Sequence, residues 1–199
     1  MLSRTADHLY WMARYTERAE NTVRMLDVCD RMSLLPGTNG GDTEGWSAIL
    51  DISELSEAYA RTGRPLTARD VIEFVALDRD NPSSVWNCLR AARENAHAVR
   101  GTLTAEMWET TNATWLEIRE VTPHKLQGMD LGEFFEWVKF RSHLLRGVTF
   151  GTMLHDDAFK FVRLGTYLER ADNTARLLDV KYHSLLPRAD GLTSSTDFY

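Results

Sequence analysis

A helical motif of fourteen residues occurs twice in this chain, once near each end, and it constrains the fold more than any other feature. Tyr15–Val28 and Tyr167–Val180 are identical at ten of fourteen aligned positions, at a constant offset of 152 residues. In both copies apolar residues recur every three or four positions, which is the spacing of one face of an α-helix. This self-similarity predicts an internally repeated long helix.

The rest of the chain has the same helical periodicity, and strict alternation of the kind found in strands is hard to find. Proline is scarce, with 5 residues among 199, and it lies between the periodic segments. We therefore predict an all-α fold, a mostly antiparallel bundle of about seven helices, because short connections favour antiparallel neighbours. The predicted helices span residues 3–34, 46–61, 67–77, 81–98, 104–120, 130–146 and 156–185, and residues 38–45 form a flexible loop.

Several local signals place the ends of these helices. Thr67 followed by Asp70 resembles a capping box, and Asn81 before Pro82 is a strong helix start. The segment Leu35-Pro36-Gly37 predicts the end of the first helix, because proline disfavours helix in the residue before it. His155-Asp156-Asp157 most simply caps the last helix.

Length and charge limit the possible functions. A chain of 199 residues with 43% hydrophobic content suits one domain, which we predict over residues 1–199. The net charge of −6 and the lack of a dense Lys/Arg stripe argue against a nucleic-acid partner. No run of about 18 apolar residues and no signal peptide are present, so we predict no membrane span and a cytoplasmic location.

Metal and cofactor chemistry find little support in the sequence. Cys29 and Cys88 lie far apart in helical segments and are expected to be buried apolar residues rather than a disulfide or metal site. Glu94 and His97 have the Glu-x-x-His spacing of di-iron bundles, but such sites need two of these motifs and two further Glu. A solvent-facing pair is the simpler interpretation. We predict no metal and no cofactor, and no complete catalytic constellation identifies a reaction.

A helical wheel gives each copy of the motif an apolar stripe and a polar face. The stripes, predicted to be core, are Leu9, Met12, Thr16, Ala19, Val23 and Leu26, and in the second copy Phe161, Leu164, Leu168, Ala171, Ala175 and Leu178. The polar face comprises Glu17, Arg18, Asn21 and Arg24, matched by Glu169, Arg170, Asn173 and Arg176. Asp27 and Asp179 lie nearer the apolar boundary.

The two copies differ mainly at apolar positions, and the change from Glu20 to Asp172 is mild. The Glu-Arg pair, the Asn, the Arg and the last Asp are the same in both. Charged residues opposite an apolar stripe are ordinarily a solvated face, but such a face constrains residue identity weakly and should diverge first. Two other interpretations are therefore open beside the solvated face. The two helices pack their polar faces together in a buried Glu/Arg/Asn network, or the faces line a cleft for an anionic or peptide-like ligand.

At this motif the sequence resembles the bacterial alpha-E family, helical proteins named for a Glu-Arg signature. The stretches that carry the resemblance are residues 1–6, 9–15, 17–21, 81–84, 92–96, 106–109, 146–149 and 169–176. Members usually continue well beyond the second copy, which implies that this chain is a fragment or a shorter form. The family has no established activity to carry over. Its association with circularly permuted ATP-grasp proteins and with transglutaminase-like proteins implies a system that makes or breaks amide bonds in peptides.

Three functions follow as hypotheses. The first is an accessory helical protein that partners an ATP-grasp or transglutaminase-like protein. The second is an enzyme acting on amide bonds or peptides, with Glu17 or Glu169 as general base and Arg18, Arg24, Arg170 or Arg176 binding carboxylate or phosphate. The low pKa expected of a carboxylate among several Arg suits anchoring better than proton abstraction. The third is a structural bundle whose polar network fixes register, and a homo-oligomer is compatible with all three.

Overall fold

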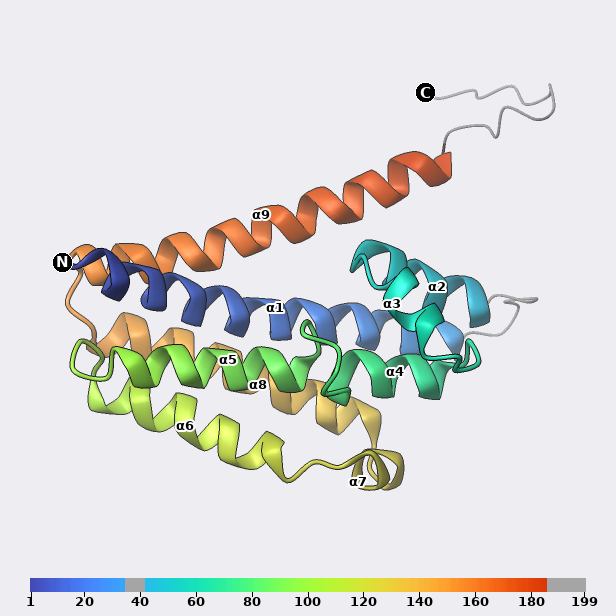
Figure 1. Cartoon of the computed structure of the whole chain (residues 1–199), viewed down its shortest axis with the longest axis horizontal. Coiled ribbons are helices and arrows are strands. Elements are labelled where there is room, and N and C mark those ends of the chain that lie inside the picture. The colour runs from blue at the N-terminus through green and yellow to red at the C-terminus, as the bar shows by residue number, and fades with distance from the viewer. Residues whose placement is uncertain (35–41, 186–199) are drawn as a thin grey trace.

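The computed structural model describes residues 1–34 and 42–185, and within these residues the chain is all α-helix, with no strand (Figure 1). The predicted all-α class is confirmed. Nine helices form in the described part, against about seven predicted. They are α1 (Ser3–Ser33), α2 (Asp42–Ile52), α3 (Ser56–Arg61), α4 (Ala68–Leu77), α5 (Val85–Ala98), α6 (Ala105–Arg119), α7 (Pro123–Gly128), α8 (Leu131–Thr152) and α9 (Asp157–Leu185).

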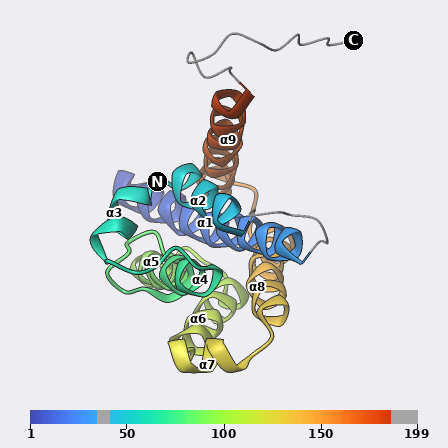
Figure 2. The same ribbon diagram turned by 90° about the vertical axis from the view of Figure 1, so that its right-hand side faces the viewer.

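Four long helices form a closed ring. α1 packs on α5, α5 on α6, α6 on α8, and α8 again on α1, with successive members running in opposite directions (Figure 1). α9 lies outside this ring on the side of α1 away from α6, as the view along the helices shows (Figure 2). α9 packs on α1 and runs in the same direction, so the two motif helices are parallel neighbours. The remaining short helices cover the end of the ring near the C-terminus of α1.

The buried apolar side chains form two clusters along α1. The larger one joins the C-terminal half of α1, through Val23 and Leu26, to α2, α4, α5 and α8. The smaller one joins Leu9 and Met12 to the ends of the other long helices and to the first turns of α9. The apolar stripe predicted for the first motif is confirmed, since all its members are buried apart from the half-buried Thr16.

The apolar stripe predicted for the second motif was wrong. Leu164, Leu168 and Leu178 of α9 are exposed, and so are Ala171 and Ala175. Only the first turns of α9, at Ala158, Phe159 and Val162, enter the core, and Phe161 packs at its edge. Periodicity defines two faces of a helix but not which of them faces the protein. Here the polar face is turned inward, because α1 presents matching charged groups to it.

The predicted helix over residues 46–61 is divided in two. α2 ends with a turn in which the Leu55 amide donates to the Leu50 carbonyl at 2.7 Å, while Glu54 has a left-handed φ of 55°. This is the geometry of a helix C-terminal cap, in which glycine is the usual residue. α2 also begins earlier than predicted: residues 42–45 are helical rather than loop, and residues 38–41 lie outside the described part. Burial of Trp46, Ile49 and Leu50 stabilises this helix through packing.

Two of the predicted helix starts are confirmed, and a third was misplaced. Thr67 accepts from the Asp70 amide, and Asp156 accepts from the Ala158 amide, so both predicted caps are confirmed. α5, however, begins at Val85 with Ser84 as its cap, and Asn81 instead bonds the Ser83 amide and the Phe74 carbonyl.

α8 runs on to Thr152, beyond the predicted 146, and α7 was not predicted. α1 ends at Ser33, and the stop signal at residues 35–37 lies outside the described part.

The structure also bears on the two cysteines and on the predicted absence of a membrane span. Cys29 and Cys88 are both free thiols, Cys88 being buried and Cys29 half-buried. Among the described residues no helix is long and apolar enough to span a membrane.

Candidate functional site

α1 and α9 are in tight contact at Gly165. A Cβ added to this glycine would lie 2.3 Å from the carbonyl oxygen of Tyr10 and 3.1 Å from the Cβ of Ala13. Only glycine therefore permits this approach, since side-chain carbon atoms are not found so close to backbone oxygen. The polar faces of the two motifs begin within a turn of this point, so side chains from one helix reach the other.

The Glu-Arg pair of each motif is bonded to the Glu-Arg pair of the other. Arg18 of α1 donates to Glu169 of α9 through Nε and Nη2, at 2.6 and 3.1 Å. Reciprocally, Arg170 donates to Glu17 through Nε and Nη2, at 2.6 and 3.4 Å. Because the parallel helices place equivalent turns side by side, each glutamate faces the arginine of the opposite helix. Such two-point guanidinium–carboxylate bonds fix geometry as well as adding energy.

Each of these glutamates has a second arginine. Glu169 also accepts from Nε of Arg14 at 2.6 Å, and Glu17 accepts from Nη1 of Arg146 on α8 at 2.9 Å. Both carboxylates are only 3% exposed. A carboxylate can remain charged at such burial only when it is paired and hydrogen-bonded, so the arginines are a condition for the close packing of α1 on α9.

Glu20 continues the network toward α8. It is 2% exposed and accepts from Arg146, Arg24 and Ser142, the shortest bonds being 2.6, 2.7 and 2.5 Å. Burial by itself raises the pKa of this carboxyl. The hydrogen bonds from Arg146, Ser142 and Arg24 outweigh burial and lower the pKa from its ordinary value of 4.5 to about 2. Glu20 is thus an ionised anchor between α1 and α8.

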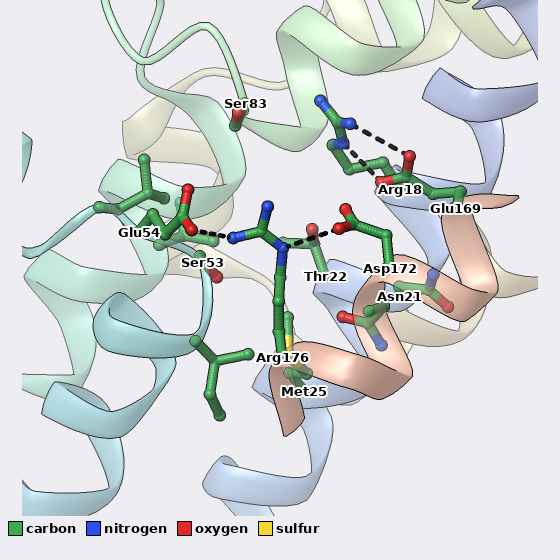
Figure 3. Close-up of a pocket in the computed structure, with 14 residues that line it drawn as sticks. Arg18, Asn21, Thr22, Met25, Ser53, Glu54, Ser83, Glu169, Asp172 and Arg176 are labelled. Carbon is green, nitrogen blue, oxygen red and sulfur yellow. Dashed lines mark hydrogen bonds and ion pairs between the residues drawn. The ribbon is translucent and has the colours of Figure 1, made fainter. Parts of the chain in front are cut away.

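Beside the reciprocal pairs lies a cavity of about 230 Å³, bounded by α1, α9 and the α2–α3 junction (Figure 3). Arg176 of α9 extends across it. Its Nη1 lies 2.6 Å from Oε1 of Glu54, and its Nε lies 3.3 Å from Oδ1 of Asp172. The wall consists of Arg18, Asn21, Thr22, Met25, Ile52, Ser53, Glu54, Leu55, Val75, Ser83, Glu169, Asp172, Asn173 and Arg176.

Two features of this wall lower the stability of the fold rather than adding to it. The side-chain nitrogen Nδ2 of Asn21 is buried without a hydrogen-bond acceptor, which costs about 1–3 kcal/mol. Glu54 has a left-handed backbone, which costs on the order of 1 kcal/mol for a residue with a Cβ. Its side chain is 74% exposed, and an ion pair this exposed contributes little. Unsatisfied donors and backbone strain are typical of functional sites.

A second cavity, of about 180 Å³, lies on the other side of the α1–α9 contact, against α8. Its wall is mainly apolar, with Glu17 and Arg170 at one edge. Arg163 there lies over the rings of Phe150 and Tyr167, 4.6 and 4.7 Å from their centroids. Arg163 also donates to the Tyr167 hydroxyl, and the two rings stabilise its charge.

The structure distributes the eight predicted site residues over three places. Five of them line the first cavity: Arg18, Asn21, Glu169, Asn173 and Arg176. Glu17 and Arg170 form the second reciprocal pair and border the second cavity. Arg24 bonds Glu20 of its own helix and extends toward α8, where its Nη2 lies 3.1 Å from Nε2 of His143.

Several residues of the network were missed by sequence reasoning. Glu20 and Asp172 are the matched acidic pair of the repeat and were treated only as a mild difference, so a signal for them was present. Arg14 aligns with Thr166 and lies before the repeat, and Arg146 is on another helix. Glu54 and Ser83 come from loops, and no periodicity could have placed them beside the motifs.

The chemistry of this region favours binding over proton transfer. Both oxygens of each of Glu17, Glu20 and Glu169 are engaged by arginine. Burial raises the pKa of Cys88 to about 12, so this thiol is inert as a nucleophile. Among the described residues no group of three His, Cys, Asp or Glu could hold a metal ion. Glu94 and His97 are exposed on α5.

These observations define a class: an all-α protein in which two parallel motif helices exchange Glu–Arg pairs around the N-terminal helix of an antiparallel bundle. A family model described as a predicted alpha-helical domain with a conserved ER motif, Alpha-E, matches residues 1–198. The chain belongs to the Alpha-E family. Glu-Arg occurs here at residues 17–18 and 169–170, the four residues of the reciprocal exchange. No curated protein and no solved structure matches the chain.

Proposed function

We propose that this protein is a non-catalytic accessory component of an ATP-grasp-type system that forms amide bonds in peptides, acting in the cytoplasm. The observation that carries the proposal is the state of the buried glutamates. Glu17 and Glu169 are each bonded by two arginines, and these bonds hold the two carboxylates in place. Such a group is an anchor, because a general base needs a free oxygen to accept a proton.

The outer face of α9 supports a protein partner. Apolar residues follow one another along it at spacings of four, three, four and three, the pattern of a helix that packs lengthwise on another helix. Its members are the exposed residues Leu164, Leu168, Ala171, Ala175 and Leu178. A continuous exposed apolar surface typically marks an interaction site. By family resemblance, the partner is the ATP-grasp protein or the transglutaminase-like protein, and α9 packs lengthwise on it.

The replacement of Leu168 by glutamate tests this partnership. We expect the variant to bind the cognate ATP-grasp protein at least about tenfold more weakly, because a charge without a partner would be buried in the contact. Its thermal stability should match that of the wild type, since Leu168 is 43% exposed in the isolated protein. Titration calorimetry of the purified components measures the affinity, and amide-bond formation by the ATP-grasp protein measures the consequence.

Leu116 provides a matched control, because it is also 43% exposed but belongs to α6. α6 lies on the opposite side of α1 from α9 (Figure 2). Leu116→Glu should leave the affinity unchanged. If the wild-type protein forms no complex with the ATP-grasp protein and does not alter its activity, the accessory role is wrong. If the wild type is instead a dimer that Leu168→Glu dissociates, α9 serves self-association.

A further inference from the structure

We propose that the cavity between α1, α9 and the α2–α3 junction binds a small zwitterion, an α-amino acid or a dipeptide. Its carboxylate is held by Arg18 and Arg176, and its ammonium by Asp172 and Glu54. The proposal concerns the isolated chain and goes beyond the accessory role, so a missing ATP-grasp complex would not affect it.

The carboxylate subsite is built from donors that the protein does not use fully. Arg176 bonds Glu54 and Asp172 through Nη1 and Nε, and its remaining nitrogen, Nη2, faces the open space between Glu54 and Ser83 (Figure 3). The pair between Arg18 and Glu169 uses Nε and Nη2 of Arg18 and not Nη1. A ligand carboxylate supplies the acceptors that these groups lack.

The ammonium subsite is the acidic side of the same cavity. Oδ1 of Asp172 lies 3.3 Å from Nε of Arg176, and its Oδ2 lies 3.6 Å from Nη2 of Arg14, which is longer than a hydrogen bond. Glu54 touches Arg176 through Oε1. One oxygen of each carboxylate is therefore available to an ammonium group, which donates three hydrogen bonds.

The overall charge of the site favours a neutral zwitterion. Arg18 and Arg176 line the cavity, and Arg14 bonds Glu169 from outside it, giving three positive groups. Glu54, Glu169 and Asp172 give three negative groups. Because groups of both signs are present, phosphate would leave the carboxylates without a partner, and a simple amine would leave the arginines without one. A ligand with one charge of each sign pairs with both subsites.

The volume limits the ligand to a small molecule. At about 30 Å³ per water molecule, 230 Å³ corresponds to about eight waters. This is below the range of roughly 300–1,000 Å³ found for drug-sized ligands. An amino acid or a dipeptide fits, and a nucleotide does not.

Glu54 gives an independent reason to regard the site as functional. Glycine would relieve the strain of its left-handed backbone, and its exposed ion pair offsets that strain only slightly. Stability alone would favour glycine at this position. The presence of glutamate is explained if its carboxylate has a ligand to bind, since binding sites commonly retain strain at some cost in stability.

The proposal is tested by titration of the isolated protein with five compounds. L-alanine and L-alanyl-L-alanine carry both charges, N-acetyl-L-alanine and L-alaninamide carry one each, and inorganic phosphate is the anionic control. We expect at least one zwitterion to bind, and the blocked compounds and phosphate to bind at least about tenfold more weakly. The better of the two zwitterions distinguishes a free amino acid from a dipeptide. Binding of neither zwitterion at millimolar concentrations would overturn the proposal, as would tighter binding of phosphate.

Three variants locate the site. Arg176→Met should weaken the zwitterion at least about tenfold, whereas Arg163→Met, on the same helix but outside the cavity, should not. Glu54→Gly should weaken binding while raising the thermal midpoint, so loss of binding cannot be attributed to misfolding. Equal affinity in Arg176→Met and Arg163→Met would place the ligand elsewhere. A Glu54→Gly variant that binds as the wild type does would remove Glu54 from the site.

Discussion

Replacement of Glu20 by glutamine is expected to lower the free energy of unfolding by about 3 kcal/mol. Glu20 is 2% exposed and is the shared acceptor for Arg146, Arg24 and Ser142. Glutamine keeps the shape but removes the charge, so Arg146 loses one of its two carboxylates. Removing one member of a buried ionic pair costs more than the pair itself contributes, because the other charge stays desolvated without compensation.

Urea denaturation of the purified variant measures this effect. Glu94→Gln is the matched control, since Glu94 pairs with Arg90 on the surface of α5, with its side chain 54% exposed. An exposed pair of this kind contributes about 0.5 kcal/mol or less. Similar losses in the two variants would mean that Glu20 is solvated and is not an anchor.

The same residue gives a dependence on pH. The pKa of Glu20 is about 2 in the folded protein and 4.5 ordinarily, so the unfolded chain binds its proton first as the pH falls. The contribution of Glu20 is therefore complete above pH 4.5 and is lost progressively as the pH falls toward 2. The stability difference between wild type and Glu20→Gln should shrink over this range. A difference that stays constant down to pH 2 would contradict the assignment.

Replacement of Gly165 by alanine is expected to destabilise the protein by about 2 kcal/mol. Helix propensity alone predicts the opposite sign, because alanine is favoured over glycine in a helix by about 1 kcal/mol. The added methyl group would lie 2.3 Å from the Tyr10 carbonyl oxygen, and backbone cannot move aside as a side chain can. α9 must therefore move away from α1, which lengthens the reciprocal bonds at Glu17 and Glu169.

Gly147 provides the control for this prediction. It lies on α8, and an added Cβ would meet no atom within 4 Å, so Gly147→Ala should stabilise the protein. Thermal and urea unfolding of both variants give the two signs directly. If Gly165→Ala were also stabilising, α1 and α9 would not be in the close contact described, and the exchange of Glu–Arg pairs would lose its basis.

Much of the secondary structure could be predicted from local pattern. The long helices α1, α6 and α9 begin and end within a residue or two of their predicted limits where these are described, because periodicity and caps are local properties. The division between α2 and α3 was missed, since its determinant is a left-handed Glu54 rather than a glycine or proline. α7 was missed because six residues are too short to show a period.

The candidate site could be predicted from the sequence only in part. Comparison of the two motif copies identified Glu17, Arg18, Glu169 and Arg170, since identical polar residues at matched positions indicate a shared constraint. The comparison could not show that Glu17 belongs with Arg170 and Glu169 with Arg18, because pairing depends on two helices lying parallel and in register. It also left the solvated face, the buried network and the cleft open as alternatives. The structure contains a network and a cavity side by side.

The amino-acid sequence by itself determined the all-α class, the two long motif helices and the polar residues that they share, since these follow from the order of residues along the chain. Only the tertiary structure decided which face of α9 is turned inward. A helix with one apolar and one charged face can bury either, depending on what its neighbour presents. α1 presents Arg14, Arg18 and Glu17 to α9, so the charged face is buried and the leucines remain outside.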